Sequence, residues 1–497
     1  MLLLGIDVGT SSIKVSVVDG ATQQTVASAQ YPETEAEIIS LQPGWAEQSP
    51  EKWWEDVKHA IKKVNSLGYY NHGDIGAIGI SYQMHGLVML DKDNGVLRNS
   101  IIWCDSRAVP YGEAAFKNIG EEKCLSCLLN SPGNFTAAKL AWVKENEPPL
   151  FDRIDKIMLP GDFIAQRLTG NITTTPSALS EGIFWDFKKG DISEDVLDQF
   201  GFDKSIVPNV KDVFAEHGRL SRKVAEELSL KEGIPVTYKA GDQPNNALSL
   251  NVLQPGEVAA TAGTSGVIYG VSDQLTYDPQ SRINSFAHVT HNNTNTRVGV
   301  LLCINGTGIL NKWTRNITGS VLSYPQMNEQ AETVHAGSDG LLMLPFGNGA
   351  ERILNNRMIG AHIYNIDFNK HTSAHIFRAA QEGIAFAFRY GLDIMRQNGM
   401  TPQVIRAGKA NMFLSNVFAN AFVNATAVPV ELYETDGSVG AALGAGIGVG
   451  YFSEPSQAFN NREVLSVIKP AQTILYNELY EKWKEALEKQ LAINNFV

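Results

Sequence analysis

The sequence has few cysteines, no long apolar segment and no excess of basic residues, and each absence excludes a class of protein. Four cysteines in 497 residues are too few for a disulfide framework. Cys124 and Cys127 have the C-x-x-C spacing of redox pairs, but no second pair or nearby histidines complete a zinc site, so we expect two reduced, buried thiols. The longest weakly polar segment, 438–452, is too short and too rich in glycine to span a bilayer.

The charge and the N-terminus narrow the choice of partners. The net charge of −12 argues against nucleic acid, which attracts a basic surface. ATP is not excluded, because backbone amides and a metal ion can bind phosphates without a positive protein. Asp7 interrupts the first apolar residues before they are long enough for a signal peptide, so we expect a cytoplasmic protein without a membrane partner.

The length and the order of predicted elements indicate an α/β protein of two or three domains. Apolar runs predict strands at 2–8, 13–18 and 25–31. A helix is expected to begin after Ser49, which is a typical N-cap and is followed by proline. A buried strand over 75–81 follows this helix.

The second half of the chain repeats the beginning of the first. A strand at 257–261, a turn at 263–266 and a strand at 267–271 match the strand–turn–strand pattern around residues 9–12, which predicts two related halves. The match covers few residues, so chance resemblance is the alternative. The chain closes with a predicted helix whose apolar stripe holds Leu475, Leu479, Trp483, Ala486 and Leu487.

Two glycine- and hydroxyl-rich turns are candidates for phosphate binding. In the first, Asp7 stands at a strand end, where its carboxylate could hold Mg²⁺ beside phosphate oxygens. A second turn opposite the first would grip a triphosphate from both sides. A plain β-hairpin that uses these residues for turn geometry is the alternative. The candidate phosphate ligands are Thr10, Ser11, Ser12, Lys14, Gly263 and Thr264.

Asp242 is the candidate catalytic residue. It follows a predicted strand at 234–240 and precedes a helix expected near Pro244. A carboxylate in this position could accept the proton of a hydroxyl group that attacks the γ-phosphate of ATP. Helix N-capping is an equally good interpretation from the sequence alone.

Two further segments are suited to a polyol. Met84 and His85 follow a buried strand, and Trp103 and Asp105 add an aromatic face and a carboxylate that could stack on a sugar and hydrogen-bond its hydroxyls. The alternatives are a structural histidine and an internal ion pair between Asp105 and Arg107. Small residues near Gly408 could admit an adenine ring, whereas those at 437–445 favour tight helix packing.

Together these segments resemble the FGGY family of carbohydrate kinases over essentially the whole chain, and within it the xylulokinases. The resemblance depends on six motifs in order: G-I-D-V-G-T-S-S at 5–12, Q-M-H-G at 83–86, W-C-D-S-R at 103–107, G-D-Q at 241–243, A-G-T-S-G at 262–266 and G-S-V-G-A-A-L-G-A at 437–445. It implies an actin/hexokinase-like (ribonuclease H-like) fold of two α/β domains, 1–245 and 246–497, with an interdomain cleft for ATP.

The resemblance also implies roles for individual residues. Asp7 would lie at the Mg²⁺–phosphate site, and Asp242 would accept the proton when D-xylulose is phosphorylated to D-xylulose 5-phosphate. The sugar would meet Met84 and His85 with Trp103 and Asp105 nearby, the phosphates Thr10, Ser11, Ser12 and Thr264, and the adenine Gly408 and Asn411.

Departures from the family pattern leave alternatives open. The adenine loop is A-G-K-A at 407–410, Pro244 follows the G-D-Q motif, and the G-E-R motif is extended to G-A-E-R at 349–352. A kinase of L-ribulose, L-fuculose or glycerol is the first alternative, because few side chains decide which hydroxyl fits. A non-catalytic actin-fold protein is the second. Relatives often form homodimers, but no stripe in this chain identifies an interface.

Overall fold

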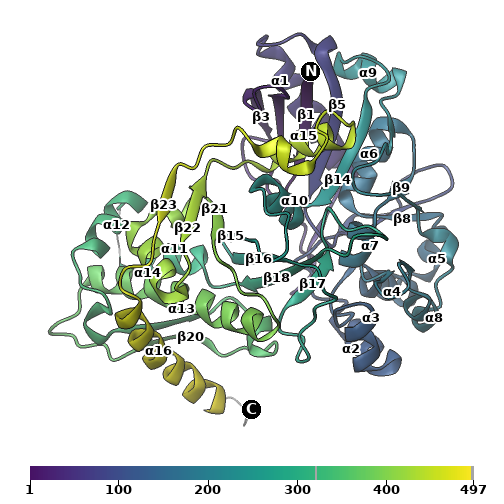
Figure 1. Ribbon diagram of the computed structural model, residues 1–497. Coiled ribbons are helices and arrows are strands. Elements are labelled where there is room, and N and C mark those ends of the chain that lie inside the picture. The colour runs from purple at the N-terminus through teal and green to yellow at the C-terminus, as the bar shows by residue number, and fades with distance from the viewer. Residues whose placement is uncertain (319–321, 494–497) are drawn as a thin grey trace.

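The computed structural model describes residues 1–318 and 322–493. Two mixed β-sheets, each flanked by helices, form its two lobes (Figure 1). The N-terminal sheet occupies the upper lobe of that view, and helices α11 to α14 gather in the lobe at lower left. No helix in the described part of the chain is long and apolar enough to cross a membrane.

The first sheet has the strand order β13-β14-β5-β1-β2-β3. β1 pairs with β2 in an antiparallel hairpin and with β5 in parallel, so that Asp7 stands opposite Lys14 on one side and Ser81 on the other. The strands are β1 (Leu2–Val8), β2 (Ile13–Asp19), β3 (Thr25–Tyr31), β5 (Ile75–Tyr82), β13 (Gly218–Arg219) and β14 (Pro235–Gly241). The predicted strand ends therefore hold to within one residue.

The second sheet repeats this arrangement, in the order β17-β18-β16-β15-β21-β22-β23. β15 forms an antiparallel hairpin with β16 and pairs in parallel with β21, as β1 does with β2 and β5. The strands are β15 (Val258–Ala262), β16 (Gly266–Ser272), β17 (Asn284–Ala287), β18 (Val298–Ile304), β21 (Ile405–Gly408), β22 (Val430–Tyr433) and β23 (Ser466–Ile468). The predicted repeat of the strand–turn–strand unit is confirmed.

Helices cover both sheets, and their ends follow local sequence signals. Helix α1 (Pro50–Ser66) begins as predicted, because the side chain of Ser49 accepts a hydrogen bond from the backbone N–H of Lys52. The other helices are α2 (Val109–Ile119), α3 (Glu121–Cys127), α4 (Thr136–Asn146), α5 (Pro148–Phe151), α6 (Pro160–Thr169), α7 (Pro176–Glu181), α8 (Glu194–Phe200), α9 (Arg222–Leu228), α10 (Asp242–Ser249), α11 (Gly308–Ile317), α12 (Tyr324–Glu332), α13 (Ser373–Gln397), α14 (Asn416–Thr426), α15 (Gly437–Gly448) and α16 (Thr473–Ile493).

Short strands complete the structure outside the two main sheets. They form four two-stranded ladders, β4 with β7, β6 with β8, β9 with β12 and β10 with β11, and a fifth hairpin of β19 and β20. Their bounds are β4 (Glu47–Gln48), β6 (Val88–Leu90), β7 (Ser100–Ile101), β8 (Lys156–Met158), β9 (Thr173–Thr174), β10 (Trp185–Asp186), β11 (Asp191–Ile192), β12 (Asn209–Val210), β19 (Leu342–Phe346) and β20 (Gly360–Tyr364).

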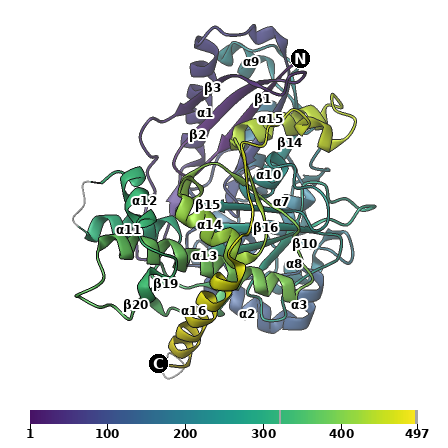
Figure 2. The ribbon, with the colours of Figure 1, turned by 60° about the vertical axis from the view of Figure 1, so that its left-hand side comes forward.

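Helix α15 connects the halves of the chain, because it comes late in the sequence but packs on the first sheet. It contacts β1, β2, β5 and β14 and lies beside them in Figures 1 and 2. Gly5 and Gly79 make this contact close: a methyl group added at either would overlap the backbone carbonyl of Ser438 or Ala441. The predicted helix packing of 437–445 is therefore confirmed, and the partner is the N-terminal sheet.

The C-terminal helix corrects one expectation. Its buried residues are Tyr476, Tyr480, Trp483 and Leu487, whereas Leu475 is exposed. Trp483 and Leu487 of the predicted stripe are buried and Leu479 is half-buried, so the prediction was wrong at Leu475, where Tyr476 supplies the buried face instead. Trp483 is fully buried and donates a hydrogen bond from Nε1 to the carbonyl oxygen of Met343, at 2.7 Å.

Candidate functional site

The turn after β1 is tied by hydrogen bonds to residues 83–86, the candidate sugar loop, and to Trp103. The hydroxyl of Thr10 donates to Oε1 of Gln83 at 3.1 Å and accepts from Nε1 of Trp103 at 3.0 Å. The backbone carbonyl of Thr10 accepts from the side chain of Gln48 at 2.8 Å. Ser11 is exposed and Ser12 half-buried. The first candidate phosphate turn and the candidate sugar loop are therefore parts of one hydrogen-bonded unit.

Asp7 lies at the end of β1, against the N-terminus of α15. A methyl group added at Gly437 would overlap the Asp7 carboxylate, so the two groups are in contact range. Burial and then the charge of Asp436 raise the pKa of Asp7. Lys14, on the facing strand, has its Nζ atom 4.0 Å from Oδ2 of Asp436. This end of the sheet thus gathers two carboxylates and one ammonium group.

The second turn meets the candidate adenine residues. The amide of Asn411 lies 3.6 Å from where a methyl group on Gly263 would be, and a methyl group on Gly408 would overlap the hydroxyl of Thr435. Thr435 is followed by Asp436 and Gly437, the residues beside Asp7. The chain therefore brings Gly263, Gly408 and Asn411 together, and the segment 435–437 leads from them to the first turn.

The backbone holds the second turn in place. The carbonyls of Gly263 and Thr264 accept hydrogen bonds from the N–H groups of Gly308 and Ile309, at 2.9 and 3.1 Å, at the start of α11. Thr264 is exposed, and its hydroxyl has no hydrogen-bond partner among the described residues. This hydroxyl is consequently available to a ligand.

Asp242 is the first residue of α10 and directly follows β14. Its side chain is half-buried, not sealed in the core. Burial and then the charge of Asp7 raise the pKa of Asp242 to about 7. The negative charge of Asp7 therefore affects the protonation of the Asp242 carboxylate. A pKa near 7 suits a base that acts near neutral pH.

Met84 and His85 lie beside the strand end that carries Asp242. A methyl group added at Gly241 would be 2.6 Å from Cγ of Met84 and 3.2 Å from Oε2 of Glu181. His85 has a positive φ of 63°, and its ring clusters with those of Phe135 and Phe286, with centroids at 4.8 and 5.5 Å. The candidate sugar loop thus adjoins the candidate base.

The orientation of the His85 ring follows from its contacts. Nδ1 lies 2.9 Å from the backbone carbonyl of Glu181, which can only accept a hydrogen bond, so Nδ1 carries the proton. Burial and then the charge of Lys139 lower the pKa of His85 to about 3, so the ring is neutral. Nε2 is therefore an acceptor, and it has no hydrogen-bond partner in residues 1–318 and 322–493.

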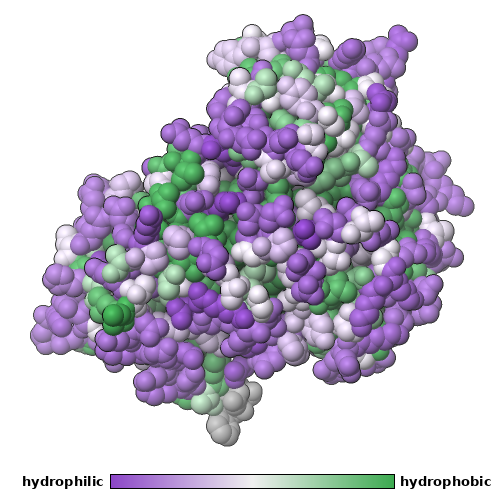
Figure 3. Space-filling model, in the orientation of Figure 1, coloured by the Kyte–Doolittle hydropathy of each residue, from purple (hydrophilic) through white to green (hydrophobic). Residues whose placement is uncertain are grey.

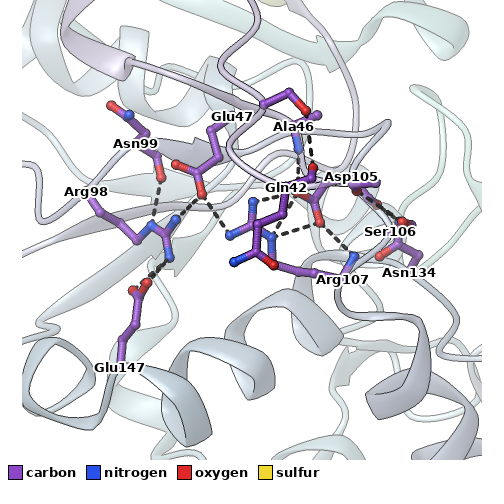
Figure 4. A network of polar contacts seen from close by, with 12 residues as sticks. Gln42, Ala46, Glu47, Arg98, Asn99, Asp105, Ser106, Arg107, Asn134 and Glu147 are labelled. Carbon is purple, nitrogen blue, oxygen red and sulfur yellow. Dashed lines mark hydrogen bonds and ion pairs between the residues drawn. The ribbon is translucent and has the colours of Figure 1, made fainter.

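Trp103 and Asp105 differ in burial, although only one residue separates them in the sequence. Trp103 is 49% exposed, so its face is open to a ligand. Asp105 is fully buried: its carboxylate receives hydrogen bonds from Arg107 and from the N–H of Ala46 (Figure 4). This is the internal ion pair given as the alternative, so the placement of Asp105 at the sugar is corrected: its oxygens are engaged beneath the loop.

The same network extends away from the site. Arg107 also pairs with Glu47 at 2.7 Å, and Glu47 pairs with Arg98, which reaches Glu147 at 2.7 Å (Figure 4). The Arg107 guanidinium lies 3.7 Å from the ring centroid of Trp45. These contacts anchor the W-C-D-S-R segment to its surroundings.

Several residues around the site belong to no motif of the sequence and were not predicted. Lys139 on α4 donates to the carbonyl of His85 at 2.8 Å, and Tyr82 donates to Oε1 of the buried Glu181 at 2.7 Å. Asp436 was part of no motif. The only sequence signal was that Lys139 and Glu181 are charged residues among apolar neighbours on short helices.

The residues around Asp7 fit a hard divalent cation bound together with phosphates. Asp7 and Asp436 offer carboxylate oxygens near one another. The negative charge of Asp436 disfavours ionisation of Asp7, and a bound cation would offset this effect. Among the described residues, no group of three His, Cys, Asp or Glu side chains forms a complete metal site. This pattern suits Mg²⁺, which protein sites commonly bind through one or two carboxylates and substrate phosphates.

All four cysteines are free; of the two that were expected to be buried, Cys124 is buried and Cys127 is half-buried. The surface in Figure 3 is polar over most of the visible face and is indented between the lobe of the first sheet and the lobe of α11 to α14.

The predicted domain boundary between residues 245 and 246 falls inside α10 and stays a prediction.

Comparison with known proteins extends the picture to the whole chain. Residues 2–249 match the N-terminal domain, and 258–449 the C-terminal domain, of the FGGY family of carbohydrate kinases. The chain is 28% identical to a xylulose kinase of Bacillus subtilis over 494 residues, which cover 97% of this chain and 96% of that one. A solved structure described as a xyloylose kinase from Brucella ovis superimposes with a TM-score of 0.90, at 26% identity and over 99% and 100% of the two chains.

A glycerol kinase from Plasmodium falciparum, solved with ADP, shares the fold with a TM-score of 0.89 at 21% identity, over 99% and 98% of the two chains. The two-domain α/β fold predicted from the sequence is thus confirmed.

Proposed function

Because this chain belongs to the FGGY family of carbohydrate kinases and is a sugar kinase, we propose that it transfers the γ-phosphate of ATP to the 5-hydroxyl of D-xylulose. The products are D-xylulose 5-phosphate and ADP. The choice of sugar is supported by the curated relatives, which are named xylulose kinases at about 28% identity. The family implies ATP and a divalent metal; we propose Mg²⁺ at Asp7.

The observation that carries this proposal is the position of Asp242. Its strand end adjoins Met84 of the sugar loop, and its carboxylate is electrostatically coupled to Asp7 of the phosphate turn. In the proposed reaction Asp242 accepts the proton of the sugar hydroxyl while the hydroxyl oxygen attacks the γ-phosphorus. The bond from that phosphorus to the β,γ-bridging oxygen breaks, and ADP leaves. Asp242 later releases the proton to solvent.

The remaining residues position the two substrates. The turn with Thr10, Ser11 and Ser12 and the turn with Gly263 and Thr264 hold the triphosphate, with Lys14 as a point charge. Gly408 and Asn411 contact the adenine. Mg²⁺, when bound, neutralises charge that develops on the phosphates. Closure of the two lobes would exclude water and limit wasteful ATP hydrolysis.

A coupled ADP-release assay over D-xylulose, L-ribulose, L-fuculose and glycerol tests the proposal. We expect the largest kcat/KM with D-xylulose. A preference for another member of the panel would identify a different kinase of the same family. ATP turnover that ignores every sugar would instead favour a non-catalytic actin-fold protein.

Asp242→Ala tests the base. Loss of general-base catalysis typically costs about 10²–10⁴-fold in rate, so we expect sugar phosphorylation to fall by roughly 10³-fold while ATP affinity by calorimetry stays within about threefold. The exposed Asp198→Ala is the matched control and should retain full activity. Joint loss of turnover and nucleotide binding would indicate a structural aspartate.

The cytoplasmic location and a homodimer also remain proposals. Size-exclusion chromatography with light scattering would measure the oligomeric state.

A further inference from the structure

Lys139 is a buried lysine that no motif accounts for. It lies on α4, is fully buried, and directs its ammonium group to the carbonyl oxygen of His85 at 2.8 Å. Thr136, one turn earlier on α4, donates its hydroxyl to the same carbonyl at 3.3 Å. Burial of a charged side chain costs free energy unless the charge is well paired, so this position requires an explanation.

The carbonyl that Lys139 holds belongs to a residue in an uncommon conformation. A positive φ is unfavourable for a non-glycine residue and persists only where surrounding contacts enforce it. His85 is fixed by Lys139 and Thr136 at its carbonyl and by the Glu181 carbonyl at Nδ1, and its ring contacts two phenylalanine rings. Nε2 is the one polar atom of the ring left for a ligand.

We propose that Lys139 is a positioning residue that holds His85 so that its Nε2 atom accepts a hydrogen bond from a hydroxyl of the sugar. This inference rests on the proposed function and deepens it. An acceptor nitrogen favours a substrate with a hydroxyl at this point and disfavours one with a carbonyl or carboxylate oxygen there, because two acceptors repel.

Electrostatics supports the same arrangement. The charged groups that face His85 are Lys139 from α4, Arg352 from the C-terminal half and the Glu181 carboxyl from α7. The two cations favour a neutral imidazole. Burial raises the pKa of the Glu181 carboxyl well above its ordinary value, so this group adds little negative charge to oppose them. Burial lowers the pKa of Lys139 to about 7, and Asp105 is the neighbour that most favours the charged form of this lysine.

Lys139→Met, which removes the donor at nearly constant volume, is the first test. We expect the sugar KM to rise about 10–100-fold, because the buried carbonyl of His85 loses the N–H donor of Lys139, while ATP KM and kcat at saturating sugar change by less than about threefold. Lys139→Gln keeps an N–H donor and should recover part of the loss. Lys144→Met is the matched control: this lysine of the same helix donates to the carbonyls of Phe200 and Gly201, away from the site, and its loss should leave the sugar KM unchanged.

A double-mutant cycle separates positioning from general destabilisation. If Lys139 acts through His85, His85→Ala combined with Lys139→Met should have the same sugar KM as His85→Ala alone. Multiplied effects in the double variant, or a sugar KM within twofold of wild type in a folded Lys139→Met, would overturn the inference. If Lys139→Met does not fold, Lys139→Gln takes its place in the cycle.

The wild-type arm keeps the two proposals apart. Absence of turnover with every sugar would refute the proposed function, and calorimetric sugar affinities would then replace KM in the same cycle. If the wild type binds none of the four sugars, both proposals fail.

Discussion

The turns after β1 and after β15 occupy equivalent places in two similar sheets, yet they are held in different ways. The hydroxyl of Thr10 is engaged by Gln83 and Trp103, whereas the second turn is fixed through the carbonyls of Gly263 and Thr264. The first turn is therefore coupled to the sugar loop by side chains. The hydroxyl of Thr264 in the second turn has no such partner among the described residues.

The strands that lead into these turns differ as well. Counting back four residues from the turn glycine gives Gly5 in the first sheet and Ala259 in the second, both buried. Counting back two gives Asp7 in the first and Thr261 in the second. The repeat thus conserves the backbone pattern, while the helix contact and the acidic group belong to one half only.

The largest expected effect concerns the helix contact. Gly5→Ala places a methyl group on the Ser438 carbonyl, so we expect it to lower the free energy of unfolding by about 3 kcal/mol. Ala259→Gly should lower the free energy of unfolding by only about 1 kcal/mol, because glycine raises the backbone entropy of the unfolded chain and creates no clash in the folded one. Urea unfolding followed by circular dichroism measures both, and equal losses would contradict the close approach of α15.

The second prediction compares the threonines of the two turns. Thr10→Val removes two hydrogen bonds that link the turn to the sugar loop, so we expect the KM values of both ATP and sugar to rise about tenfold. Thr264→Val should raise the ATP KM by a similar factor and leave the sugar KM and the melting temperature unchanged. Steady-state kinetics with ATP and with sugar as the varied substrate measures these KM values. The same changes in both KM values for the two variants would contradict the proposed difference between the turns.

The third prediction concerns pH and has the smallest effect. Asp242 is active when deprotonated, and its pKa is raised to about 7, so kcat/KM for ATP at saturating sugar should fall as the pH drops below about 7. Asp7→Asn removes the like charge that contributes to this shift, so the midpoint should move to lower pH by about half a unit to one unit. Thr261→Val should leave it in place. A midpoint unmoved by Asp7→Asn would mean that another group titrates.

Local patterns in the sequence predicted much of the fold because they depend on neighbouring residues. The first three strands, the Ser49 cap and the two strand–turn–strand units need only hydrophobic alternation, a capping residue and turn glycines. In the C-terminal helix the prediction held at Trp483 and Leu487 but missed Tyr476 and Tyr480, because tyrosine can be buried or exposed and only its packing decides.

The candidate site was predictable only where its residues lie in turns. Asp7, Met84, His85, Asp242 and Gly263 stand at strand ends, where side chains and backbone face a common edge. Lys139 and Glu181 reach this region from helices, and Asp436 caps the start of α15; the packing of all three helices depends on distant segments. The burial of Asp105 likewise follows from Ala46 and Arg107, and no local pattern reveals it.

The late arrival of α15 has a consequence for synthesis of the chain on the ribosome. The last long strand of the first sheet ends at Gly241, and the helix that covers one face of this sheet begins about two hundred residues later, at Gly437. At translation rates of about 5–20 residues per second, synthesis reaches α15 roughly 10–40 s after the end of β14. During this interval the nascent N-terminal half presents an unprotected apolar surface, which is the kind of surface that chaperones bind.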